Sequence, residues 1–303
     1  MTCKITKLAA ACALLVCTTA PAALAGSVTQ PGETVGAPVG APLTPGLYFV
    51  NTGDWGCRNT SPDSTCVGVD IPVIEWATPW TILGGRLQLV VATPLVEVGV
   101  HHTNYLRGVY NPLFAGQLAW DLGNGFGFSY LVGAYADVKT EVAWSSSSLN
   151  QRFALTYLKN GWDLTANVIW GIHRDNVSDR AQLSPCPAPF GVTPFGLTGC
   201  NPNFLNVDLT ATKKFGKWEL GPVGFYSTDL NSPIEGYQKQ RQAAVGGLVG
   251  YDFGPVIMQA YLTTDVYERN YGGHDTRFWT RVIIPIFVAQ PAPTRTALAG
   301  KQY

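Results

Sequence analysis

The segment WDLTANVIWGIH, Trp162 to His173, alternates apolar and polar residues along its whole length. One set of alternate positions is apolar: Trp162, Leu164, Ala166, Val168, Trp170 and Ile172. The opposite set carries Asp163, Thr165, Asn167 and His173. Because successive side chains of a strand point to opposite faces, the pattern predicts a β-strand with one apolar and one polar face. Its length exceeds the about five or six residues of an ordinary strand and matches the ~10 residues of an outer-membrane barrel strand.

The same period of two recurs in other segments, including FGFSYLVGAYAD (Phe126 to Asp137) and NFLNVDLTAT (Asn203 to Thr212). Short turns such as LGNG (Leu122 to Gly125) alternate with longer polar stretches, as the turns and external loops of a barrel do. The pattern predicts about twelve strands, near 46–52, 70–81, 86–96, 111–122, 126–137, 149–158, 162–173, 203–214, 218–228, 238–252, 256–268 and 276–287. An even number of strands places both chain ends on the periplasmic side.

The composition favours a chain that does not face water everywhere. Charged residues make up 13% of the sequence, whereas a soluble domain usually carries roughly a quarter. No apolar segment after Ala25 reaches the ~20 residues of a membrane helix, so a membrane chain must form a closed barrel. The sequence therefore predicts an all-β fold, a transmembrane antiparallel β-barrel of the outer membrane. A soluble β-sandwich is the alternative that periodicity alone leaves open.

The N-terminus has the order of a secretory signal, with Lys4 and Lys7, then LAAACALLV, then a small-residue site ending at Ala25. The apolar run is too short for a transmembrane anchor. We expect a signal peptide over 1–25 and a flexible N-terminal arm or plug-like segment over 26–45. The barrel is expected over 46–287 and a periplasmic tail over 288–303.

Removal of the leader leaves four of the seven cysteines: Cys57, Cys66, Cys186 and Cys200. An even number in an exported chain favours disulfides. Three pairings are possible, and the sequence-local one joins Cys57 to Cys66 and Cys186 to Cys200 within two predicted external loops. A metal site has little support, because no CxxC pair or nearby histidine accompanies these cysteines.

If the apolar faces meet lipid, the opposite faces line the lumen. This inward set mixes charges and amides, which can pair and can also set a field across a narrow passage. The predicted lumen-lining residues are Arg152, Asp163, Asn167, Asn206, Asp208, Gln259, Asp265, Arg277 and Arg281. The alternative is a salt-bridged interior that fills a closed barrel, and a barrel of this size is compatible with either.

The last predicted strand, TRFWTRVIIPIF (Thr276 to Phe287), tests this assignment. An arginine that faces lipid at mid-bilayer costs about 2 to 4 kcal/mol, so Arg277 and Arg281 are expected in the lumen. Phe287 shares their parity, although barrel strands commonly end on an outward aromatic residue. Either a bulge at Pro285 resets the alternation, or Phe287 lies at the periplasmic rim.

Catalysis finds little support in the sequence. The histidines are His101, His102, His173 and His274, and no serine lies in a nucleophile motif such as GxSxG. An outer-membrane lipid hydrolase is the less favoured enzymatic alternative. Adjacent His101 and His102 would point to opposite faces of a strand, which disfavours a shared metal ion. No cofactor is expected, and the near balance of acidic and basic residues gives no support to nucleic-acid binding.

Four segments carry a family resemblance: IEWATPWTILGGRLQLVVATPL (Ile74 to Leu95), NFLNVDLTATKKFGKWELGPVGFY (Asn203 to Tyr226), VGGLVGYDFGPVIMQAYL (Val245 to Leu262) and DTRFWTRVIIPIF (Asp275 to Phe287). They resemble the outer-membrane proteins associated with the meta-pathway of phenol degradation, a group that includes the sphingosine-inducible porin-like proteins. The resemblance implies a twelve-stranded barrel proposed to pass hydrophobic or aromatic compounds. The cysteine-bearing loop PCPAPFGVTPFGLTGCNP departs from it, because a shorter loop is expected in many relatives, so solute identity does not carry over.

Together these observations predict an outer-membrane channel for passive uptake of small hydrophobic or aromatic compounds. The alternative is a structural or ligand-binding barrel with a closed lumen. The expected partners are outer-membrane lipid, the small-molecule solute and the barrel-assembly machinery.

Overall fold

The structure, a computed structural model, describes residues 27–59, 64–100, 104–143, 146–177 and 200–289. Fourteen strands lie within these residues: β1 (Gly46–Arg58), β2 (Thr65–Ile82), β3 (Gly85–Ala92), β4 (Leu95–Val100), β5 (Asn104–Val109), β6 (Leu113–Gly123), β7 (Phe126–Tyr135), β8 (Ser148–Lys159), β9 (Trp162–His173), β10 (Phe204–Phe215), β11 (Trp218–Asp229), β12 (Arg241–Asp252), β13 (Ile257–Arg269) and β14 (Asp275–Val288). The described part of the chain contains no helix that could span a bilayer.

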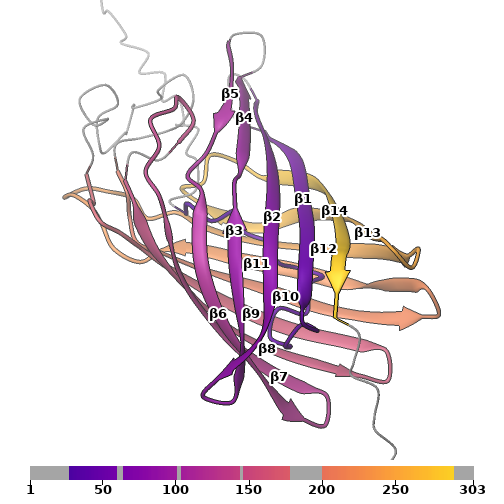
Figure 1. Cartoon of the computed structure of the whole chain (residues 1–303). Helices are drawn as coiled ribbons and strands as arrows, with labels where there is room; N and C mark the ends of the chain where they lie inside the picture. The colour runs from indigo at the N-terminus through magenta and orange to yellow at the C-terminus, as the bar shows by residue number, and fades with distance from the viewer. Residues whose placement is uncertain (1–26, 60–63, 101–103, 144–145, 178–199, 290–303) are drawn as a thin grey trace, which may run out of the picture.

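The strands form one closed antiparallel barrel, because β1 pairs with both β2 and β14 (Figure 1). β3 and β4 both pair with β2 and together make one barrel strand. β5 and β6 make the next barrel strand in the same way, because they pair with β4 and β3. The fourteen strands therefore build a barrel of 12, which confirms the predicted fold class. Gly46 of β1 pairs with Val288 of β14, so the barrel begins and ends at the same rim.

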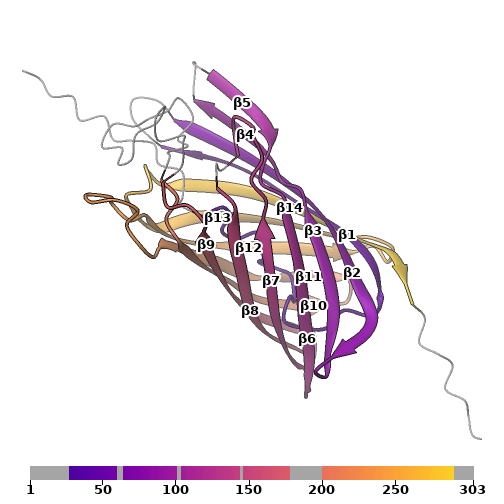
Figure 2. The same ribbon diagram turned by 60° about the vertical axis from the view of Figure 1, so that its left-hand side comes forward.

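Two of the predicted external loops are largely strand. The sequence indicates loops over 53–69 and 97–110, but the β1–β2 ladder continues to Arg58 and Thr65, and β4 pairs with β5 along its whole length. The β4–β5 hairpin projects beyond the rest of the wall (Figure 2). Ladder hydrogen bonds join backbone groups and do not depend on the side chains, so strand pairing extends into these polar stretches.

The disulfide between Cys57 and Cys66 is present and confirms the first predicted pair. The two cysteines face each other across the β1–β2 ladder. The bond therefore joins two strands, which corrects the prediction that it lies within a loop. Cys200 is also disulfide-bonded. Cys186 lies outside the described residues, so the second pairing stays a prediction.

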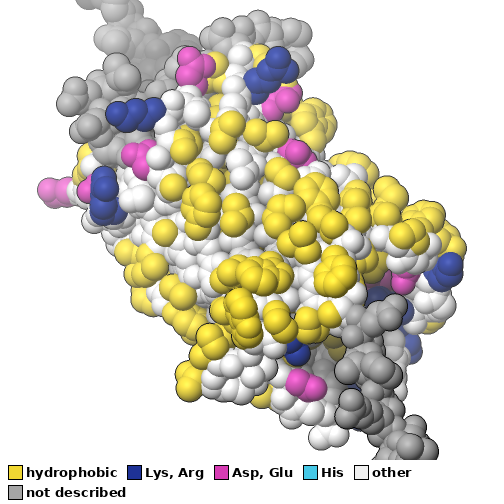
Figure 3. Space-filling model, in the orientation of Figure 1, with side chains coloured by type: hydrophobic (Ala, Val, Ile, Leu, Met, Phe, Trp, Pro, Cys, Tyr) yellow, Lys and Arg dark blue, Asp and Glu magenta, His cyan; other side chains and the backbone are white. Residues whose placement is uncertain are grey.

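Strand β9 shows the predicted alternation in space. Trp162, Leu164 and Trp170 are exposed, whereas Asp163 and Asn167 are buried on the opposite face. Large apolar side chains are exposed on the other strands as well and form a broad hydrophobic band over the outer face in view (Figure 3). Because soluble monomers rarely expose so wide an apolar surface, we assign this band to the lipid.

Three prolines lie at one height of the wall, on neighbouring barrel strands: Pro72 in β2, Pro94 between β3 and β4, and Pro112 between β5 and β6. Each proline carbonyl accepts a backbone bond from the next strand. Proline has no N–H to return the second bond of the pair. Beside Pro112 the side chain of Asn111 supplies that bond, donating to the Ala136 carbonyl at 3.0 Å. Both interrupted barrel strands therefore break next to a proline.

The last strand has the predicted irregularity. Tyr48 pairs with Pro285, whereas its neighbour Leu47 pairs with Phe287, so Ile286 is an extra residue on the β14 side. A β-bulge of this kind resets the alternation of side chains. Phe287 is consequently exposed on the outside, which confirms the bulge and favours it over a regular strand end.

Candidate functional site: the lumen and the N-terminal arm

The arm, residues Ser27–Pro45, lies inside the barrel. It precedes β1 and turns back into the lumen, where the indigo trace crosses the interior in both ribbon views (Figures 1 and 2). Thr29 and Val35 are fully buried there. The structure places residues 27–45 in the lumen, where a plug-like segment would lie. Gly26 lies outside the described residues.

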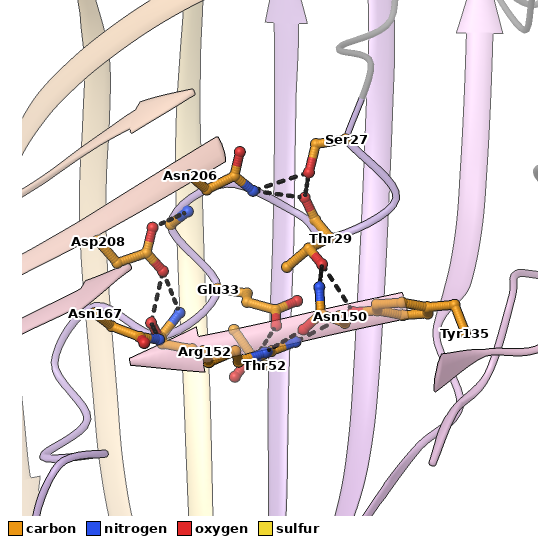
Figure 4. A network of polar contacts seen from close by, with 12 residues as sticks. Ser27, Thr29, Glu33, Thr52, Tyr135, Asn150, Arg152, Asn167, Asn206 and Asp208 are labelled. Carbon is orange, nitrogen blue, oxygen red and sulfur yellow. Dashed lines mark hydrogen bonds and ion pairs between the residues drawn. The ribbon is translucent and has the colours of Figure 1, made fainter. Parts of the chain in front are cut away.

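Asp208 of β10 is the main anchor of the arm (Figure 4). Its Oδ1 accepts a bond from the Gly32 N–H at 2.9 Å. Its Oδ2 accepts from the Thr34 N–H at 3.0 Å and from the Thr34 hydroxyl at 2.6 Å. Gly32 has a φ of 89°, and an added Cβ would meet the Phe225 ring at 2.6 Å. The tight approach therefore needs glycine, because other residues rarely adopt this φ and would collide with the ring.

The start of the arm is held by amide side chains of the wall (Figure 4). Asn206 donates to the Ser27 hydroxyl at 2.9 Å and to the Thr29 carbonyl at 3.1 Å. Asn150 donates to the Thr29 hydroxyl at 3.1 Å, and that hydroxyl donates to the Tyr135 oxygen at 3.2 Å. These bonds come from β7, β8 and β10, which lie close together on one side of the barrel, so the start of the arm is fixed to that side.

An ion pair joins the middle of the arm to β8. Glu33 lies 2.7 Å from the Arg152 guanidinium. Arg152 also donates to Asn150 at 2.8 Å and to the Tyr135 oxygen at 3.2 Å. Both charged side chains are about nine-tenths buried, with 11% and 10% of their side-chain surface exposed. Their charges therefore neutralise each other inside the lumen.

Arg281 of β14 binds the arm through backbone carbonyls. Its guanidinium donates to the carbonyls of Glu33 and Val35 and, at 2.9 Å, to the Thr52 hydroxyl. Next to it, Gln259 donates to the Gly36 carbonyl at 2.8 Å. A planar guanidinium can make several such bonds in a fixed geometry, so Arg281 binds two carbonyls of the arm at once.

Two further lumenal clusters are built from charged side chains of the wall. Arg277 pairs with Asp54 and with Asp275, the latter at 2.7 Å, and Arg58 lies 3.8 Å from Asp275. Asp265 accepts a bond from Gln242 at 2.8 Å. At the opposite end Asp163 accepts from the Thr165 hydroxyl at 2.6 Å. Asp54 also interacts with the side chain of Gln30 in the arm, whereas Asp163 and Asp265 are bound by wall residues.

All nine predicted lumen residues lie on the inward face, and they divide into two groups. Six contact the arm: Arg152, Asn167, Asn206, Asp208, Gln259 and Arg281. Three are held by bonds to neighbouring wall residues: Asp163, Asp265 and Arg277. The alternation of polar and apolar residues predicts which side chains face inward. It does not predict the binding of the arm, because that depends on contacts between residues more than a hundred positions apart in the sequence.

Part of the lumenal wall is apolar, which the sequence reasoning missed. In the upper half of β2 the inward positions are Val67, Val69 and Ile71, all buried. The outward positions there include Asp70, whose carboxylate is bound by Asn51 at 2.7 Å. The usual assignment, apolar side to lipid, is thus inverted on this stretch. The signal was in the sequence: Asp70 shares its parity with outward Trp76, so the valines must face the other way.

Two cavities lie between the arm and this apolar wall. The upper one, of about 70 Å³, is lined in part by Val67, Val69, Val96 and Val98. The lower one, of about 190 Å³, is lined in part by Val73, Val90, Leu113 and Leu131. Both are lined by three residues in common: Glu33, Ile71 and Tyr135. A path along the inner face of β2 would therefore pass from one cavity to the other at Ile71.

The described residues contain no group of three or more His, Cys, Asp or Glu side chains that could hold a metal ion. Of the histidines considered in the sequence, His173 is buried beside Phe204, with ring centroids 6.0 Å apart. His101 and His102 lie outside the described residues. The arrangement that the structure does show is a polar arm seat beside an apolar wall with two cavities.

The model of the family described as "Putative MetA-pathway of phenol degradation" matches residues 48–282. The chain belongs to this family. A solved outer-membrane channel from Pseudomonas putida F1 has 12% identity and a TM-score of 0.61, with 84% of this chain and 99% of that chain covered. At this identity the likeness concerns the fold alone.

Two other solved barrels are less similar. The β domain of the Bordetella autotransporter BrkA has 9% identity and a TM-score of 0.49, covering 80% of this chain and 100% of that one. The NanC porin has 7% identity and a TM-score of 0.46, covering 78% and 98%. No curated protein matches the sequence. This family member is an outer-membrane β-barrel, as its lipid-facing band and its fold both indicate.

Proposed function

We propose that this barrel is a channel for passive uptake of small hydrophobic or aromatic compounds. The observation that carries the proposal is the apolar wall of β2, Val67 to Val73, with a cavity on either side of Ile71. A ligand path usually combines an apolar lining with few polar groups. The solute would enter the upper cavity, pass Ile71 and leave through the lower one.

The charged side chains around this path favour an uncharged solute. Arg277 and Arg58 beside the upper cavity are close to Asp54 or Asp275, and Arg152 is paired with Glu33. Paired charges leave little net field to attract an ion. The polar residues thus support the arm and the wall, while the solute would move along the valines.

The second candidate is a structural or ligand-binding barrel with a closed lumen. It is favoured by the arm, which fills part of the interior and is held by an ion pair and several hydrogen bonds. The two candidates differ in flux: a closed barrel passes neither ions nor solute, whereas a restricted channel passes solute with little ion current.

Proteoliposomes that contain the refolded mature chain test the proposal. We expect influx of toluene well above that of protein-free liposomes, and loss of this influx in Ile71→Trp, because the larger side chain would block the junction of the cavities. The matched control is Ile74→Trp, since Ile74 is exposed on the outer face of the same strand. No influx in any variant, together with no current in planar bilayers, would favour the closed barrel.

The remaining expectations are part of the same proposal. The barrel would act without enzymatic activity and without a cofactor, with outer-membrane lipid, its solute and the barrel-assembly machinery as partners, and it would not bind nucleic acid. Absence of lipid hydrolysis by the refolded chain in phospholipid vesicles is the expected outcome. Measurable release of fatty acid, lost in His173→Ala, would support the lipid hydrolase instead.

A further inference from the structure

We infer that the lower cavity is a binding site for a neutral single-ring compound that carries one hydrogen-bond donor, and that Glu75 receives this donor. The inference rests on the proposed function and assigns a ligand class and an acceptor residue to its lower cavity. It follows from three features of the cavity: its size, the polar pair at one end, and the charges around it.

The size of the cavity suits one aromatic ring. Its volume is about 190 Å³, and a dry apolar cavity of roughly 150 Å³ is sufficient to bind benzene. The wall residues that would surround the ring are aliphatic: Val50, Val73, Val90, Leu113, Leu131 and Ile283. A single ring with one small substituent therefore matches the space.

The polar end of the cavity has a fixed orientation. The Leu43 N–H donates to the Gln88 carbonyl oxygen at 3.3 Å, so the Gln88 amide group turns its N–H toward Glu75 and donates to Oε1 at 2.6 Å. Among the described residues, Gln88 is the one that donates to this carboxylate. A carboxylate has about four acceptor positions, so Glu75 can accept a further bond from a ligand hydroxyl.

The charges around the cavity favour a neutral ligand. Four charged side chains of the described chain line it: Glu33, Glu75, Arg152 and Arg281. Glu33 and Arg152 form an ion pair, and Arg281 donates to carbonyls of the arm. Glu75 forms no ion pair with a described residue. Arg281 likewise forms no ion pair with a described residue. The two acidic and two basic side chains therefore balance, and this arrangement favours a neutral ligand.

Titration calorimetry on the refolded mature chain in detergent tests the site with three probes of similar size. Phenol has a donor, toluene lacks one, and benzoate is an anion. The cavity-filling variant Leu131→Trp gives the background of each probe in detergent. We expect phenol and toluene to bind above this background and benzoate not to bind. Equal heats in wild type and Leu131→Trp for all probes would overturn the inference.

Two substitutions of Glu75 separate recognition from packing. In Glu75→Leu we expect phenol affinity to fall about tenfold or more, with toluene affinity unchanged or higher. In Glu75→Gln, which keeps the shape, we expect benzoate to begin to bind. Asp70→Asn is the matched control, because it removes a carboxylate from the outer face of the same strand. Phenol affinity that is equal in wild type and both Glu75 variants would contradict the assignment.

The test distinguishes this inference from the proposed function. Phenol binding that depends on Glu75 without toluene influx in proteoliposomes would leave the site in place in a closed barrel. Toluene influx that is blocked by Ile71→Trp, without any effect of Glu75 on phenol binding, would leave the channel and remove the site. Heat-modifiable gel migration shows for each variant that the barrel has folded.

Discussion

One carboxylate oxygen of Asp208 in β10 accepts two hydrogen bonds from Thr34 of the arm, from the backbone N–H at 3.0 Å and from the hydroxyl at 2.6 Å. The same carboxylate binds the Gly32 N–H. The backbone N–H groups of Gly32 and Thr34 and the Thr34 hydroxyl are therefore all bound by one wall carboxylate. Asp208 thus binds two residues in the middle of the arm.

Replacing Asp208 with alanine is therefore expected to release the middle of the arm. Hydrogen bonds to charged groups contribute about 1.5–3 kcal/mol each, and water in the opened lumen would replace part of this, so we expect a loss of about 2 kcal/mol in stability. Ion conductance in planar bilayers should rise. Asp163→Ala is the control, because Asp163 is a lumenal carboxylate bound to Thr165 of the wall. Equal conductance of the two variants would show that Asp208 does not hold the plug.

The ion pair between Glu33 and Arg152 should behave as a coupled unit. Removing one partner leaves the other charge buried, which typically costs about 3–5 kcal/mol. We expect a smaller loss in the double variant Glu33→Gln with Arg152→Met than the sum of the two single losses. Urea unfolding in lipid vesicles measures the cycle. Additive losses would mean that the two side chains act independently despite their 2.7 Å separation.

The barrel could be predicted from the sequence because lipid imposes one rule on every strand. Trp162 and Leu164 outside, and Asp163 and Asn167 inside, follow from period two and from the cost of charge in lipid. The same rule predicted the bulge next to Pro285. Tyr48 pairs with Pro285 and Leu47 with Phe287, so Ile286 is left without a partner in β1.

The interior could not be predicted in the same way, because its contacts depend on chain segments far apart. Nothing within residues 27–45 names Asp208 as a partner, since 174 residues separate it from Thr34. The apolar wall at Val69 was missed for a different reason. In the first half of β2 the apolar side chains face the lumen, unlike those of most other strands. This is visible in the sequence only because Asp70 lies an even number of residues from Trp76 and must share its outward face.

The disulfide between Cys57 and Cys66 should contribute modestly to stability. Closing a short loop limits the unfolded chain by about 2 to 3 kcal/mol in the loop-entropy model, and residual structure in the unfolded chain lowers this gain. In the folded barrel the two cysteines lie opposite each other in the β1–β2 ladder. We expect the double variant Cys57→Ser with Cys66→Ser to lose about 1 to 2 kcal/mol in urea unfolding and to keep its solute influx. Loss of influx would place the disulfide in the transport path.

The row of prolines gives the sharpest structural prediction. Pro112 cannot donate a bond to the Ala136 carbonyl, and Asn111 donates to it instead at 3.0 Å. Asn111→Leu should leave that carbonyl unsatisfied and cost about 1–3 kcal/mol. Pro112→Ala restores a backbone N–H in the ladder, so the double variant should recover most of this loss. Pro112→Ala alone should change stability little, because Asn111 already satisfies the carbonyl. If the second substitution does not rescue the first, Asn111 stabilises the wall through its other contacts and not as a substitute for the missing proline donor.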